Sequence, residues 1–65
     1  MLDTIFKAKL KEADKWVYWN QFGEITNDKG KRTHLNITNG ASTKYYYFIH
    51  QVTHLLDKDT VKRLG

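Results

Sequence analysis

A chain of 65 residues is long enough for one small domain, residues 1–65, and such domains bury only about 60% of their unfolded surface. Cysteine is absent, which excludes disulfides and thiolate metal sites. Lys and Arg outnumber Asp and Glu by 11 to 7, and the resulting net charge of +4 excludes an acidic mimic of DNA. This excess serves solubility, or it marks the footprint of a polyanion. The N-terminus has no apolar run as long as a signal peptide or membrane span, so we expect a cytoplasmic protein outside membranes.

Two strands are predicted at the start of the chain. Residues 4–10 alternate apolar and basic side chains, the pattern of a half-buried strand. Its apolar face is Phe6, Ala8 and Leu10, and its basic face is Lys7 and Lys9. Residues 15–22 are apolar on both faces, which predicts a central strand with cover on each side. Those faces are Trp16, Tyr18 and Phe22 on one side, and Val17 and Trp19 on the other.

Turn residues separate the strands that follow. The Asn-Asp-Lys-Gly run at residues 27–30 predicts a type I turn that ends with Gly30 in the left-handed conformation. We therefore expect a hairpin between residues 24–26 and 31–33. The third strand then continues through residues 34–38, with its apolar side chains inward.

The Asn-Gly pair at residues 39–40 predicts a second hairpin, whose register depends on which face is apolar. A two-residue turn at 39–40 would place Lys44 on the core side, opposite Leu35. A three-residue loop, residues 39–41, pairs Leu35 with Tyr45 instead. We favour this second register because it keeps the lysine out of the core.

Four consecutive aromatic residues, 45–48, dominate the returning strand. Neighbouring side chains of a strand point to opposite faces. The predicted inward residues are Tyr45, Tyr47 and Ile49. The predicted outward residues are His34, Asn36, Lys44, Tyr46, Phe48 and His50. So small a domain leaves some rings unburied, which suggests a partner, unless the first strand or a terminal helix covers Tyr46 and Phe48.

The remaining residues predict a fifth strand at 51–56 and a short helix. Asp57 is a good N-cap for this helix, with Val61 and Leu64 on one face and Gly65 as the stop signal. The pattern as a whole predicts a mainly β fold: a small antiparallel sheet or SH3-like barrel of about five strands with a short C-terminal helical turn.

Three short motifs occur at intervals along the chain. They are Phe6-Lys7-Ala8-Lys9, Trp16-Val17-Tyr18 and Asp57-Lys58-Asp59-Thr60-Val61. They resemble successive landmarks of the YopX family, small proteins of bacteriophages and prophages. The chain departs from that pattern at Trp19 and Lys62, where the family favours glycine, and at Lys58, where it favours proline. It also stops before the family's closing Glu-Gly-Asp segment, which predicts an incomplete barrel that a second copy could complete. The resemblance implies a phage origin and a β-rich fold, and it supplies no catalytic residues.

Neither a metal site nor catalysis is predicted. His34, His50 and His54 offer imidazoles, but no cysteine assists them and the carboxylates fall in turns. The only serine, Ser42, belongs to a predicted turn, and no phosphate-binding glycine loop is present. We therefore predict a protein that is not an enzyme and needs no cofactor.

The surplus aromatic face predicts a protein-binding surface, because tyrosine and tryptophan are enriched at interface centres. The predicted partner-binding residues are Trp19, His34, Lys44, Tyr46, Phe48 and His50. Together with the phage resemblance, this predicts a stoichiometric inhibitor of a bacterial host protein or of an anti-phage defence protein such as a nuclease. Self-association into a homo-oligomer is a special case.

The alternative is a single-stranded nucleic-acid-binding module. The same rings would stack on bases, while Lys44 and the hairpin tip would contact phosphates. The possible phosphate contacts of that tip are Lys29, Lys31 and Arg32. The aromatic residues are concentrated whereas the basic residues are dispersed, which favours the protein partner.

Overall fold

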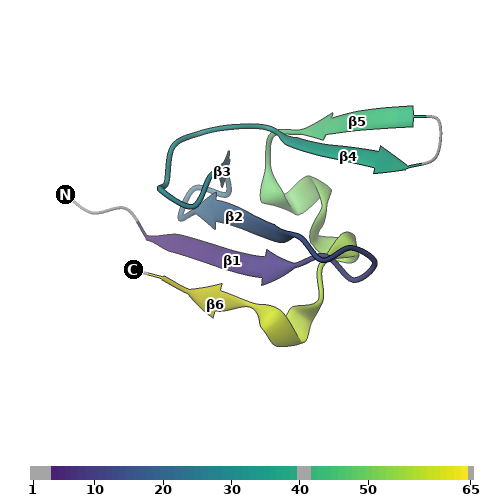
Figure 1. Cartoon of the computed structure of the whole chain (residues 1–65). Helices are drawn as coiled ribbons and strands as arrows, with labels where there is room; N and C mark the ends of the chain where they lie inside the picture. Colours follow the sequence, from purple (N-terminus) through teal and green to yellow (C-terminus); the bar gives the residue numbers. More distant parts are fainter. Residues whose placement is uncertain (1–3, 40–41, 65) are drawn as a thin grey trace.

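The computed structural model describes residues 4–39 and 42–64, and it confirms a mainly β fold built from small antiparallel sheets (Figure 1). The strands are β1 (Ile5–Lys9), β2 (Trp16–Asn20), β3 (Ile25–Thr26), β4 (Leu35–Asn39), β5 (Ser42–Tyr46) and β6 (Lys62–Arg63). One sheet has the order β3-β2-β1-β6, and β4 and β5 form a separate hairpin. Among the described residues no strand pairing closes these sheets into a barrel, so the SH3-like barrel stays a prediction.

The first two strands form as their apolar patterns predicted. They pair antiparallel with Ala8 opposite Val17 and Lys7 opposite Tyr18. β2 lies between β1 and β3, which confirms its central position. Because side chains alternate along a strand, the sheet has a core face with Ala8 and Val17, and an outer face with Lys7 and Tyr18.

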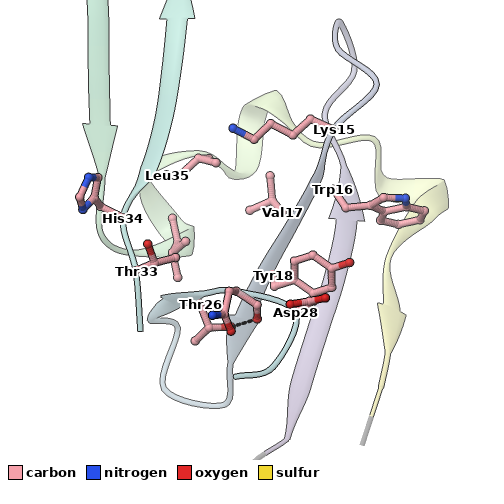
Figure 2. Close-up of a pocket in the computed structure, with 11 residues that line it drawn as sticks. Lys15, Trp16, Val17, Tyr18, Thr26, Asp28, Thr33, His34 and Leu35 are labelled. Atoms are coloured by element: carbon pink, nitrogen blue, oxygen red, sulfur yellow. Dashed lines mark hydrogen bonds between the residues drawn. The ribbon is translucent and has the colours of Figure 1, made fainter. Parts of the chain in front are cut away.

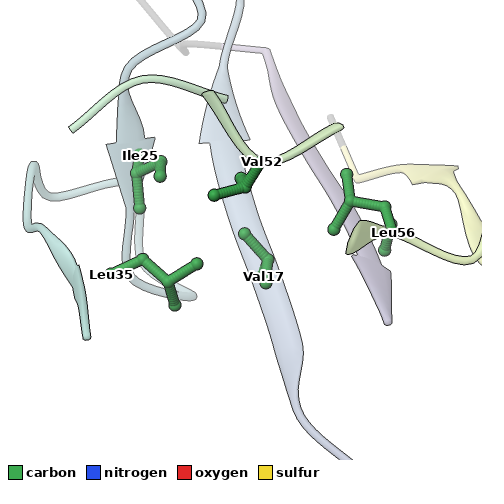
Figure 3. Packing of buried hydrophobic residues seen from close by; sticks show 6 residues of the cluster. Val17, Ile25, Leu35, Val52 and Leu56 are labelled. Carbon is green, nitrogen blue, oxygen red and sulfur yellow. The ribbon is translucent and has the colours of Figure 1, made fainter. Parts of the chain in front are cut away.

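The core lies between the core face of the sheet, the start of the β4–β5 hairpin and the 3₁₀ turns (Figure 3). Its buried residues are Ala8, Val17, Ile25, Leu35, Val52 and Leu56. Burial of one Val or Leu side chain contributes about 1.5–3 kcal/mol. A core of this size gives a small domain a narrow stability margin, so single hydrogen bonds matter in this molecule.

The turn at residues 27–30 confirms the predicted chemistry. Gly30 has a φ of +85°, and its N–H donates to Asn27 O at 3.1 Å. The side-chain Oδ1 of Asn27 accepts from the N–H groups of Lys29 and Lys31 at 2.9 and 3.0 Å. A bridge between Thr26 and Arg32 begins the expected hairpin. The strand does not run on into residues 34–38, however, because β4 belongs to the other sheet.

The predicted register of the second hairpin is wrong. β4 pairs with β5 so that Leu35 lies opposite Tyr46 and Ile37 opposite Lys44. The predicted loop, residues 39–41, lies partly outside the described residues. Lys44 is tolerated beside Ile37 because its side chain is exposed and a lysine stem can cover apolar surface while its ammonium stays in water. The inward ring is therefore Tyr46, which packs against the core.

The predicted fifth strand at residues 51–56 is also wrong. Two 3₁₀ turns, η1 (Ile49–Gln51) and η2 (Thr53–Leu55), occupy this segment, and only an isolated bridge joins Leu56 to Leu10. β1 already pairs with β2 on one edge and with β6 on the other, so no long strand edge remains for these residues. The turns place Val52 over the core instead.

Asp57 is an N-cap, as predicted. Its side chain accepts a hydrogen bond from the N–H of Asp59 at 3.1 Å, at the start of η3 (Lys58–Thr60). The helix does not extend to Val61 and Leu64, because the chain turns into β6 beside β1 and Leu64 N–H donates to Ile5 O at 2.7 Å. The predicted stop signal, Gly65, lies outside the described residues.

Candidate functional site

An aromatic cluster lies on the outer face of the β4–β5 hairpin. The ring of His34 lies 4.8 Å from that of Tyr45 and 5.9 Å from that of Tyr47, centroid to centroid. The two tyrosines are 51% and 53% exposed. His34 meets Tyr45 edge-on and Tyr47 at a tilt, so the cluster presents two large rings to solvent around one imidazole.

The segment that carries the cluster is tied to the sheet. Ile25 N–H donates to Tyr47 O at 3.1 Å, and Ile49 N–H donates to Gly23 O at 2.8 Å. The side-chain oxygen of Gln51 accepts from the N–H groups of Tyr47 and Phe48, both at 3.0 Å. These bonds continue β5 along the edge of β3, so the cluster lies on ordered backbone and not on a free loop.

A cleft of about 330 Å³ adjoins the cluster, between the sheet and the start of β4 (Figure 2). Val17 and Leu35 approach each other across it, and Ile25 also lines it. Its other lining residues are Lys15, Trp16, Tyr18, Thr26, Asn27, Asp28, Thr33 and His34. The cleft thus has apolar walls of core residues and a polar rim, and it shares His34 with the aromatic cluster.

The cleft is bordered by two strand edges. β3 ends at Thr26, opposite Tyr18 of β2. Backbone groups alternate sides along an antiparallel strand, so the N–H and C=O of Trp16 point to the same side as those of Tyr18, where β3 no longer reaches. Across the cleft, the carbonyl of Asn36 in β4 accepts a hydrogen bond from Lys15 Nζ at 3.2 Å. One lysine side chain spans the gap, and it runs from the β2 side toward β4 (Figure 2).

The residues predicted to bind a partner do not share one surface. Trp19 stacks on Phe6 at 5.8 Å and packs against the core, as does Tyr46. Phe48 stacks on His50 at 5.7 Å, beside the turn at the edge of β3. Lys44 shares the face of Ile37 and Tyr46, and His34 alone joins the aromatic cluster.

The expected inward positions of Tyr45 and Tyr47 are corrected by the same register, since both rings lie outside. The predicted Ile49 does pack against the core. The surplus of aromatic surface is real: Phe48 is exposed as predicted, whereas Tyr45 and Tyr47 are exposed in place of Tyr46. Neither the two tyrosines, Tyr45 and Tyr47, nor the cleft was predicted to belong to the site.

The basic residues of the first hairpin tip have different surroundings. Lys29 and Lys31 are exposed on the turn. Arg32 forms an ion pair with Glu24, Nε to Oε2 at 3.2 Å. Their predicted contacts with phosphate stay a prediction.

No group of three His, Asp or Glu side chains that could hold a metal ion occurs within residues 4–39 and 42–64. In the same part of the chain, no helix is long and apolar enough to cross a membrane. No family model, curated protein or solved structure matches this chain. The resemblance to the YopX family therefore stays a prediction.

Proposed function

We propose that this chain is a non-catalytic binding protein that acts by stoichiometric association with another protein. The observation that carries this proposal is the aromatic cluster, in which Tyr45 and Tyr47 keep half of their surface exposed around His34. Large rings held in place bury interface area at a small cost in side-chain entropy, which is why they dominate interface energetics. The cluster and the cleft beside it form the proposed contact surface.

The two strand edges suggest how a partner is held. An extended segment of the partner would lie between β2 and β4 and hydrogen-bond to the free backbone groups of Trp16 on one side and to Asn36 on the other. Lys15 would release the carbonyl of Asn36 to the incoming strand. An apolar side chain of that segment would enter the cleft between Val17 and Leu35, while neighbouring residues meet the tyrosines.

The class of partner rests on the resemblance and not on the geometry. A phage-encoded protein of this kind acts in the bacterial cytoplasm, where a host protein or an anti-phage defence protein such as a nuclease is the proposed target. Occupation of its surface by this chain would inhibit it. A second copy of this chain is the alternative occupant of the same surface.

Affinity capture from bacterial lysate tests the proposal with three baits: the wild-type chain, the Tyr45→Ala/Tyr47→Ala variant and the Val61→Ala variant. Val61 is an exposed apolar residue of the C-terminal region and serves as the matched control. We expect the double variant to lose at least about thirtyfold in affinity for the captured protein, since truncated hot-spot residues typically cost 2 kcal/mol or more. Light scattering of the purified complex should give a fixed stoichiometry.

If the double variant captured the same protein as well as the wild type does, the aromatic cluster would not be part of the interface. Thermal unfolding of each bait provides the folding control, because both tyrosines are half exposed and their loss should change stability little. Thr33→Trp fills the rim of the cleft and leaves Tyr45 and Tyr47 in place, so it tests the strand-addition mode.

A further inference from the structure

The outer face of the four-stranded sheet carries a cluster of lysines around one indole. The ammonium groups of Lys7, Lys9 and Lys62 lie 4.2, 5.4 and 6.0 Å from the ring centroid of Trp16. They come from β1 and β6, whereas Trp16 comes from β2. Three strands thus bring together residues that are 55 positions apart in the sequence, between Lys7 and Lys62 (62 − 7 = 55). We call these four residues the basic face.

The arrangement of charge on the basic face is unfavourable for the isolated chain. Lys7 lies directly opposite Lys62 in the β1–β6 pairing, and like charges at such positions destabilise a sheet. Within the described residues, no carboxylate forms an ion pair with either of them. Lys9 pairs with Asp14 at 3.1 Å, but the Asp14 side chain is 92% exposed, so this pair is easily exchanged.

The first hairpin packs onto the same side of the sheet. A Cβ atom on Gly30 would lie 2.9 Å from Ile5 Cδ1. Ile5 and Lys7 are two positions apart in β1, so both lie on the outer face. The turn at residues 27–30 therefore packs onto the outer face, where it brings one acidic and one basic residue, Asp28 and Lys29. Figure 2 shows Asp28 of that turn beside Tyr18, and the indole of Trp16 turned away from the cleft.

We propose that the basic face binds single-stranded nucleic acid, and that this second site is separate from the aromatic cluster and shares with the cleft only Trp16, whose indole is turned away from it. The lysines meet backbone phosphates, whose negative charge relieves the repulsion between Lys7 and Lys62. When Lys7 swings to a phosphate it uncovers the indole of Trp16, on which a base stacks. An acidic peptide would satisfy the lysines but carries a ring only where an aromatic residue happens to lie beside its acids, whereas every nucleotide supplies both a phosphate and a base, so the combination of charge and ring favours a nucleic acid.

Fluorescence anisotropy of a labelled oligothymidylate of about 20 nucleotides tests the proposal over a salt series, starting near 20 mM salt where such contacts are strongest. Three phosphate contacts predict a slope of about −2 for the logarithm of the binding constant against that of the salt concentration. Lys7→Gln should make this slope shallower by about 0.7 and weaken binding. Lys44→Gln removes the same charge from the β4–β5 hairpin and should leave the slope unchanged.

Trp16→Leu should weaken binding at every salt concentration by about fivefold or more without changing the slope, because stacking does not release counterions. Lys62→Gln repeats the charge test at an exposed residue in β6, should Lys7→Gln fail to fold. The Tyr45→Ala/Tyr47→Ala variant should bind the oligonucleotide as the wild type does. Oligonucleotide binding would thus be observed even if the protein-binding proposal failed. Capture of a protein partner would likewise not depend on oligonucleotide binding.

Absence of oligonucleotide binding at low salt overturns the inference. Equal effects of Lys7→Gln and Lys44→Gln would also overturn it, since they would show diffuse attraction and no site. The third contrary result is displacement of the oligonucleotide by polyglutamate at a similar concentration of charge, which would identify the face as a site for acidic polypeptides.

Discussion

Asn20 ends β2 and holds the following turn with one buried side chain. Its Oδ1 accepts from the N–H groups of Phe22 and Glu24, both at 3.0 Å, and its Nδ2 donates to Glu24 Oε1 at 2.9 Å. In this turn Gly23 O accepts a hydrogen bond from the N–H of Ile49, and this bond anchors the segment behind the aromatic cluster. Replacement of Asn20 by alanine removes all three side-chain hydrogen bonds and leaves the backbone pairing of β2 in place.

Each of these hydrogen bonds contributes about 1 kcal/mol net, so Asn20→Ala should lower the free energy of unfolding by about 2–3 kcal/mol. In a domain of this size a loss of 1 kcal/mol lowers the melting temperature by about 4–8 °C, which predicts a decrease of roughly 10–20 °C. Glu24→Gln is the matched control. It keeps an acceptor for Asn20 Nδ2 and breaks the ion pair with the largely exposed Arg32, which should cost less than about 1 kcal/mol.

Thermal and urea unfolding followed by circular dichroism would measure both variants, and an unchanged dependence on urea would show that only stability has changed. If Asn20→Ala melted within about 3 °C of the wild type, water would be replacing the asparagine at little cost, and the turn would not depend on this side chain. If Glu24→Gln lost as much as Asn20→Ala, the ion pair would be the stabilising element instead.

Two further variants test the packing of the sheet. Gly30→Ala should cost about 1–2 kcal/mol, because φ is +85° and the new Cβ would meet Ile5 Cδ1 at 2.9 Å. Combination with Ile5→Val should recover part of that loss in urea titrations, and strictly additive effects would argue against the contact. Val52→Ala empties a fully buried position and should cost about 2–3 kcal/mol, whereas Val61→Ala, at 48% exposure, should cost less than about 0.5 kcal/mol. Similar melting temperatures for these two valine variants would contradict the assignment of the core.

Features that depend on neighbouring residues could be predicted from the sequence. The alternating strand predicted at residues 4–10, the central strand predicted at 15–22 and observed as Trp16–Asn20, the turn ended by Gly30 and the N-cap at Asp57 are all present in the structure. Each of them is decided by interactions within a few residues, so no knowledge of the rest of the fold was needed.

Features that depend on distant residues could not be predicted. The register of the second hairpin turned on whether Lys44 could lie on the core side, and it can because its side chain reaches solvent there. Residues 51–56 were predicted to form a strand, but the edges of β1 are already taken by β2 and β6. In both cases the local sequence suggested a structure, but the distant segments that compete for the same position could not be identified from it.

The candidate site was predictable in kind but not in position. The run of rings at residues 45–48 indicates surplus aromatic surface, and parity then divides it between two faces. Which face is outside follows from the register, so one error in pairing exchanged Tyr46 for Tyr45 and Tyr47. The cleft depends on the short length of β3, and the basic face depends on the pairing of β6 with β1, which no local motif reveals.

The pairing of β6 with β1 affects how this protein folds during its synthesis. The partners Phe6 and Arg63 are 57 positions apart (63 − 6 = 57), and Val52 and Leu56 supply the lid of the hydrophobic interior. When only the first half of the residues has been synthesised, the chain holds β1, β2 and β3, and the apolar face of this partial sheet is uncovered. The fold can therefore be completed only after the C-terminal residues have been synthesised. Until then the exposed apolar surface is accessible to chaperones and proteases.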